Sequence, residues 1–272
     1  MFWPRRRRYA VIAHVDGNAK ALAAVLDDID AQGVDEIICL GNLIGAGPDP
    51  ATCVDLAFER DIAIVRGCHE EVLFGGAEPH PARLCCSYEW PGLVAGLERS
   101  RELLRAAGGD RWRRYRALPE RLTRRSLVFV HGTLDDPIGG GFDLGKPSGI
   151  LTGFGRFLFC SHHSAGSPWG ALIGPAGRHL PQLDPNAIDW GHPDRPAFGA
   201  WSPEQLGWRI EVRGKAIVMP GAVGRVEGPR PGARYVPGQA DLVSGARHEA
   251  RYVLAQGRTI TWRQVHYGPA TG

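Results

Sequence analysis

Several features are absent from the sequence, and each absence excludes a class of protein. No run of apolar residues reaches the eighteen or so that are needed to span a bilayer, so we expect no membrane insertion. The apolar residues after Arg8 form a core strand rather than the apolar region of a secretory signal, and we expect a cytoplasmic protein. The six cysteines show no framework spacing, which favours reduced thiols over disulfides.

A large excess of charge is also absent. The formal net charge is only +3, and much of the excess lies in residues 5–8, RRRR. We therefore expect no nucleic-acid-binding face and predict a small molecule as the partner. Residues 1–8 are interpreted as a solvated basic tail. With 43% hydrophobic and 22% charged residues in the chain, residues 9–272 are expected to form one domain.

The hydrophobic pattern predicts strands that alternate with helices. Residues 9–13, 35–40 and 62–65 are predicted as buried strands, and residues 19–29 and 50–60 as the helices between them. This spacing indicates βαβ units in a largely parallel sheet, with a ligand site beyond the carboxyl ends of the strands. Further predictions are strands at 126–130, 156–160, 215–219, 250–254 and 259–265, a helical segment at 82–115 and a loop excursion at about 180–210.

Polar side chains follow the predicted strands at the point where each strand ends. His14 and Asp16 come directly after the first strand. Residues two positions apart on an extended segment point to the same side, so this imidazole and carboxylate would suit a metal ion. The other strand ends are Gly41-Asn42, Gly67-Cys68-His69-Glu70, His131-Gly132 and Ser161-His162-His163-Ser164. Together they predict metal binding at one edge of the sheet.

The order of these motifs resembles that of the calcineurin-like metallophosphoesterase superfamily, in its bacterial branch. The family pattern is DxHxN or DxHGN, GDxxG, GNHD, a lone GH or HG, GHTH and NPGSVG. The counterparts here are HVDGN at 14–18, GNLIG at 41–45, GCHE at 67–70, HG at 131–132, SHHS at 161–164 and PGAVG at 220–224. The resemblance implies an α/β fold, a four-layer α/β/β/α sandwich of two facing sheets with the site at one edge.

The resemblance also implies a set of metal ligands, from which this chain departs at nearly every position. The first ion would contact His14, Asp16, bridging Asn42 and Ser164 (or His163 in place of Ser164), and the second would contact Asn42, Cys68, His131 and His162. Cys68, His131 and His162 would form a Cys-His-His set, as in a zinc or iron site with an open fourth position. The implied cofactor is one or two divalent transition metal ions, of iron, zinc or manganese.

The resemblance assigns His69 to the group that protonates or stabilises the leaving group, with Glu70 orienting it. The implied function is a metal-dependent hydrolase that cleaves a phosphoester or related ester through a metal-bound water. The altered ligands leave two alternatives open. One is a non-hydrolytic iron or redox metalloenzyme of specialised metabolism, and the other is an inactive binding module on the same fold.

Overall fold

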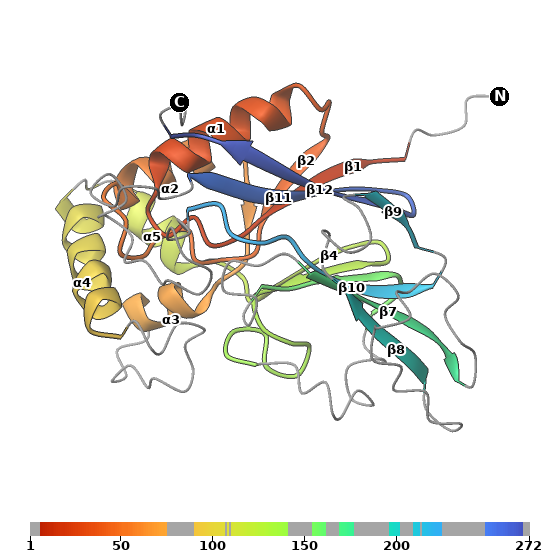
Figure 1. The fold of residues 1–272 in the computed structure, drawn as a ribbon. Coiled ribbons are helices and arrows are strands. Elements are labelled where there is room, and N and C mark those ends of the chain that lie inside the picture. The colour runs from red at the N-terminus through yellow and green to blue at the C-terminus, as the bar shows by residue number, and fades with distance from the viewer. Residues whose placement is uncertain are drawn as a thin grey trace.

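The structure is a computed structural model that describes residues 6–74, 90–106, 108, 110–140, 154–161, 169–176, 196–201, 209–212, 214–224 and 248–268. It contains two six-stranded sheets that face each other, with helices packed against the first of them (Figure 1). Within the described residues, no helix is long and apolar enough to cross a membrane.

The first sheet has the strand order β3-β2-β1-β11-β12-β9. Its strands are β1 (Arg8–Ile12), β2 (Glu36–Cys39), β3 (Ala63–Ile64), β9 (Arg209–Glu211), β11 (Glu249–Gln256) and β12 (Thr259–His266). Strands β1, β2 and β3 are parallel, as the βαβ pattern predicted, and α1 (Ala19–Asp30) and α2 (Pro50–Glu59) connect them. The remaining pairs are antiparallel, so the prediction of a largely parallel sheet is wrong and the sheet is mixed.

The second sheet has the order β4-β5-β6-β10-β7-β8. Its strands are β4 (Arg121–Arg124), β5 (Leu127–Val130), β6 (Phe157–Phe159), β7 (Trp169–Ala176), β8 (Pro196–Trp201) and β10 (Lys215–Met219). Strands β5, β6 and β10 are parallel to one another. Strand β8 falls inside the predicted excursion at 180–210. Its sequence, PAFGAW, lacks apolar alternation, and backbone pairing with β7 makes it a strand.

The core explains why the buried strands are apolar on both faces. Along β1, Tyr9 and Val11 belong to the cluster between the two sheets, whereas Ala10 and Ile12 belong to the cluster under the helices. Helices, first sheet and second sheet thus form three successive layers, and the helical fourth layer of the expected sandwich remains a prediction. Arg8 belongs to β1 rather than to the basic tail, and its backbone N–H donates to the Asp35 carboxylate (2.7 Å).

Three further helices lie beside the carboxyl edge of the first sheet: α3 (Cys68–Phe74), α4 (Trp90–Ala106) and α5 (Arg111–Arg116) (Figure 1). Helices α4 and α5 confirm the helical character predicted for much of residues 82–115. Helix α3 was not predicted, because its seven residues follow the strand loop directly. It places Cys68, His69 and Glu70 in one helical turn.

Residues 220–224 close the end of β1. The backbone N–H of Val223 donates to the Ala13 carbonyl (3.0 Å), and that of Gly224 donates to the His14 carbonyl (2.8 Å). A Cβ atom at position 224 would lie 1.7 Å from the carbonyl oxygen of Val15. Glycine is therefore required at this contact, and any side chain must displace the backbone that carries His14.

We expect Gly224→Ala to lower the free energy of unfolding by about 3 kcal/mol, the upper range for overpacking. Gly33→Ala is the control for the clash, because a Cβ there meets nothing within 4 Å, although the backbone of Gly33, unlike that of Gly224, is left-handed (φ 61°). It should cost only about 1 kcal/mol of backbone strain. Urea denaturation of both variants measures the difference, and equal losses would contradict the predicted clash.

Candidate active site

Hydrogen bonds join the two sheets at the edge where their parallel strands end. His131, which follows β5, has ring Nδ1 2.7 Å from the carbonyl oxygen of Leu40, which follows β2. His14, which follows β1, has ring Nε2 3.0 Å from the carbonyl oxygen of Ser161, which follows β6. Carbonyl oxygens only accept, so these contacts place a proton on Nδ1 of His131 and on Nε2 of His14.

Three candidate ligands have a left-handed backbone. The φ angles are 50° for His14, 55° for Asp16 and 55° for Asn42, and all three side chains are buried. This conformation costs on the order of 1 kcal/mol for each non-glycine residue and persists only where the surrounding structure imposes it. The extended geometry expected for His14 and Asp16 is therefore wrong, because β1 ends at Ile12.

Asn42 lies at the centre of the polar network. Its Oδ1 accepts from the backbone N–H of His69 (3.0 Å), which leaves the amide nitrogen facing the other side. That nitrogen lies 3.2 Å from Nδ1 of His14 and 3.5 Å from Sγ of Cys68, so it donates to both. Burial, followed by the nearby charge of His131, holds the pKa of His14 well below its ordinary value, and this imidazole is neutral.

Cys68 and His131 form a buried sulfur and nitrogen pair, exposed by 1% and 0%. Burial alone would lower the pKa of His131. The pKa is nevertheless raised, chiefly by the charge of Cys68 and a side-chain hydrogen bond to it, with help from the Leu40 carbonyl. Because Nδ1 of His131 is committed to Leu40, the ring presents Nε2 as the atom that can bind a ligand.

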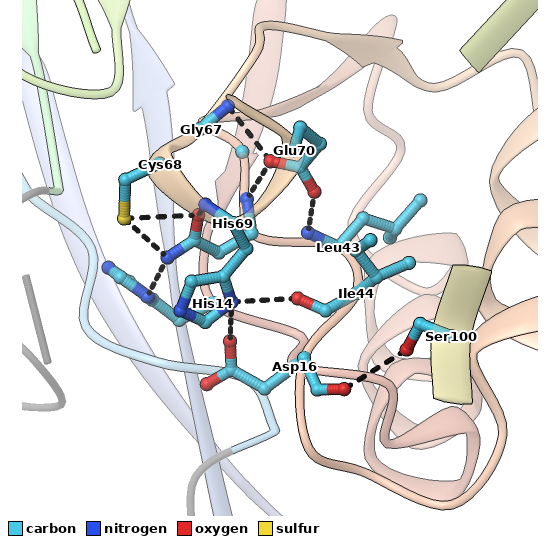
Figure 2. A network of polar contacts seen from close by, with 12 residues as sticks. His14, Asp16, Leu43, Ile44, Gly67, Cys68, His69, Glu70 and Ser100 are labelled. Carbon is cyan, nitrogen blue, oxygen red and sulfur yellow. Dashed lines mark hydrogen bonds and ion pairs between the residues drawn. The ribbon is translucent and has the colours of Figure 1, made fainter. Parts of the chain in front are cut away.

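His69 is held by two oxygen atoms. Its Nδ1 lies 2.8 Å from the carbonyl oxygen of Ile44 and 3.3 Å from Oδ1 of Asp16 (Figure 2). The proton therefore belongs to Nδ1, and Nε2 is the ring atom that can exchange a proton with a substrate. Asp16, expected beside His14 on a metal ion, here accompanies His69.

Glu70 does not orient His69 as expected. Its buried carboxylate instead accepts from backbone N–H groups of Asn42, Leu43 and Gly67, and from the hydroxyl of Tyr115. The prediction that it contacts the imidazole is wrong, because the first turn of α3 directs its carboxylate towards the backbone of the two neighbouring loops (Figure 2).

The sequence pattern assigned no individual role to two residues of this network. Tyr115 of α5 donates to Glu70, which is 45 positions away in the sequence, and no local sequence pattern predicts such a contact. The hydroxyl of Ser161 lies 3.0 Å from Nδ1 of His131. The position of Ser161 directly after an apolar strand was the sequence signal that could have identified it as a site residue. The predicted ligands His162, His163 and Ser164 lie outside the described residues.

We compared the chain with known protein families, sequences and solved structures. No family model matches the chain. A stretch of 66 residues is 39% identical to an uncharacterized protein of Methanocaldococcus jannaschii, but it spans 24% of this chain and only 27% of that relative. This likeness assigns no function to the whole chain.

Solved structures are similar over nearly the whole chain. A metallophosphoesterase from Sphaerobacter thermophilus matches with a TM-score of 0.63 and 22% identity, covering 96% of this chain and 89% of that one. The chain has the metallophosphoesterase fold. A hypothetical protein from Pyrococcus horikoshii OT3 matches with a TM-score of 0.58 and 18% identity, covering 96% of this chain and 88% of the other. These likenesses confirm the α/β fold of the metallophosphoesterase type that the sequence motifs implied, whereas its fourth layer stays a prediction.

The donors present on this metallophosphoesterase fold do not fit a pair of ions bridged at position 42. The Asn42 nitrogen already donates to His14 and Cys68, and an amide N–H₂ group does not bind a cation. Cys68 and His131 instead offer one sulfur and one nitrogen, the ligand types of zinc or iron. The part of the chain that the structure describes holds no group of three or more His, Cys, Asp or Glu that could bind an ion. A further ligand would have to come from the remaining residues.

Proposed function

We propose that the chain is a metal-dependent hydrolase of a phosphoester or a related ester, with a single soft divalent ion. Cys68 and His131 would hold this ion, and the predicted ligand His162 would complete a Cys-His-His set. The observation that carries the proposal is the buried pair of Cys68 and His131, with His131 oriented by the Leu40 carbonyl, on a metallophosphoesterase fold. When bound, the ion would supply Lewis acidity to the ester and lower the pKa of water.

The remaining residues have distinct tasks in this proposal. Asn42 donates to Cys68 and thereby stabilises negative charge on the sulfur, without adding a charge of its own. Neutral His14 accepts from the same amide and fixes its orientation. Both contacts are buried, so water competes little for them.

His69 is the proposed general acid. Protonated at both nitrogens, it would donate from Nε2 to the departing oxygen while Nδ1 stays bonded to Ile44 and faces the Asp16 carboxylate. The carboxylate stabilises positive charge on the ring by proximity. His69 is exposed by only 2%, so in this proposal substrate reaches Nε2 through a local opening of the structure.

His69→Gln should lower kcat by about 100- to 10,000-fold, the usual contribution of general acid catalysis, with metal content unchanged. Hydrolysis is measured with alkyl phosphate monoesters and diesters, whose alkoxide leaving groups need a proton, and with a carboxylic ester and a thioester, using metal-reconstituted protein. His266→Gln is the matched control, because that side chain is 74% exposed. Equal turnover in the two variants would contradict the assignment of His69.

The same panel separates the alternatives. Fully metallated wild-type protein that hydrolyses none of the four substrates would count against the hydrolase. A thiolate-to-metal absorption band that changes with oxygen or reductant would then favour a redox metalloenzyme. Absence of metal, with stability unchanged by chelator, would favour a binding module.

A further inference from the structure

The Glu70 carboxylate accepts hydrogen bonds at all of its acceptor positions. The donors are neutral and come from three different segments of the chain. Oε2 accepts from the backbone N–H of Asn42 (2.8 Å) and of Gly67 (2.8 Å). Oε1 accepts from the backbone N–H of Leu43 (2.9 Å) and from the Tyr115 hydroxyl (2.5 Å). A carboxylate has about four lone-pair sites, so this buried charge is fully satisfied without a salt bridge.

The three backbone contacts tie the loop after β2 to the loop after β3 through the Glu70 carboxylate. The first loop carries Asn42, and the second leads directly into Cys68 and His69. Space between the loops is limited, because a Cβ at Gly67 would lie 2.4 Å from Oδ1 of Asn42. The carboxylate therefore sets the separation of the backbones that carry the amide, the thiol and the proposed acid.

Tyr115 is a permanent donor to this carboxylate. Burial first, and then the negative charge of Glu70, raise the pKa of the hydroxyl well above its ordinary value, so it remains protonated. The side chain is fully buried, and its ring packs edge-on against Phe74 of α3 with centroids 5.5 Å apart. Helix α5 thus supplies the fourth donor to the Glu70 carboxylate.

We propose that Glu70 and Tyr115 form a positioning pair that fixes the two loops carrying Asn42, Cys68 and His69. Neither residue contacts the reacting atoms. The proposal rests on the function proposed above for its effect on metal binding, but the positioning itself can be measured without turnover.

Tyr115→Phe tests the pair, because it removes one hydroxyl and keeps the ring. Tyr252→Phe is the matched control: Tyr252 is also fully buried and donates to a carboxylate, that of Asp28 (2.7 Å). Amide hydrogen exchange of the full chain is followed by NMR. In Tyr115→Phe we expect exchange at Asn42, Leu43 and Gly67 to accelerate at least about tenfold beyond that at core amides such as Val11, and in Tyr252→Phe no such local acceleration.

A second arm measures the affinity for cobalt(II), read from absorption of the cobalt thiolate. Loss of an outer contact typically weakens metal binding 10- to 100-fold, and we expect about tenfold in Tyr115→Phe with no change in Tyr252→Phe. Equal exchange and equal affinity in the two variants would overturn the pair. Wild-type protein that binds no cobalt would instead overturn the proposed metal site. The hydrogen-exchange comparison of the two variants would then be the test of whether Glu70 and Tyr115 position the loops.

Discussion

Replacing Glu70 with alanine is expected to lower the free energy of unfolding by about 4 kcal/mol or more. The substitution leaves four buried donors, three backbone N–H groups and the Tyr115 hydroxyl, without their acceptor. Each buried unsatisfied donor costs about 1–3 kcal/mol, and entry of water into the space recovers part of the loss. An effect of this size is exceptional for one substitution and should lower the melting temperature by about 10 °C or more.

Glu70→Gln provides the graded comparison. The glutamine keeps one acceptor oxygen, and the Tyr115 hydroxyl can rotate to accept from the new N–H₂ group. We therefore expect a loss of about 2 kcal/mol, between wild type and Glu70→Ala. The ordering is measured by urea denaturation monitored by circular dichroism. A Glu70→Ala variant as stable as wild type would show that these contacts do not form in solution.

The second large effect concerns the proposed metal ligands. Removing either Cys68 or His131 by alanine substitution should weaken binding of zinc or cobalt by more than about 100-fold, since even outer contacts are worth 10- to 100-fold. Hydrolysis should fall with it, because the ion supplies the Lewis acidity. Equilibrium titration against a chelating dye measures the affinity.

Cys53→Ala is the control for Cys68→Ala. Cys53 is also fully buried, but it lies in α2 and burial raises the pKa of its thiol, which makes it a poor ligand. It should retain metal and lose only the packing of one small side chain. Metal affinity lowered equally in both cysteine variants would indicate a general loss of structure and contradict the assignment of Cys68.

The sequence predicted the elements that depend on local patterns. Continuous apolar runs marked β1, β2 and β5, and the polar residues after them identified His14, Asn42 and His131 as neighbours at one edge. For β1 and β2 this worked because parallel strands of one sheet end on the same side. Strand β5 belongs to the second sheet, and His131 meets the first sheet through its contact with the Leu40 carbonyl. Strand β8 was missed because its order comes from pairing with β7 rather than from its own composition.

The sequence indicated which residues belong to the site better than it indicated how they contact one another. The orientation of Asn42 depends on a backbone N–H of His69, which no motif encodes. The left-handed backbone at His14 and Asp16 contradicted the extended geometry inferred from their spacing, although aspartate and histidine tolerate that region better than most residues. Glu70 was identified, but its partners were wrong because Tyr115 is distant in sequence.

The amount of metal per chain tests the central claim most directly. Untagged protein is purified without oxygen, and its metal is quantified by elemental mass spectrometry beside Cys68→Ala. We predict one zinc or iron ion per wild-type chain and none in the variant. Two ions per chain would contradict the single-ion site inferred from Asn42, and a wild-type protein that neither contains nor takes up metal would contradict the proposed metal-dependent hydrolase.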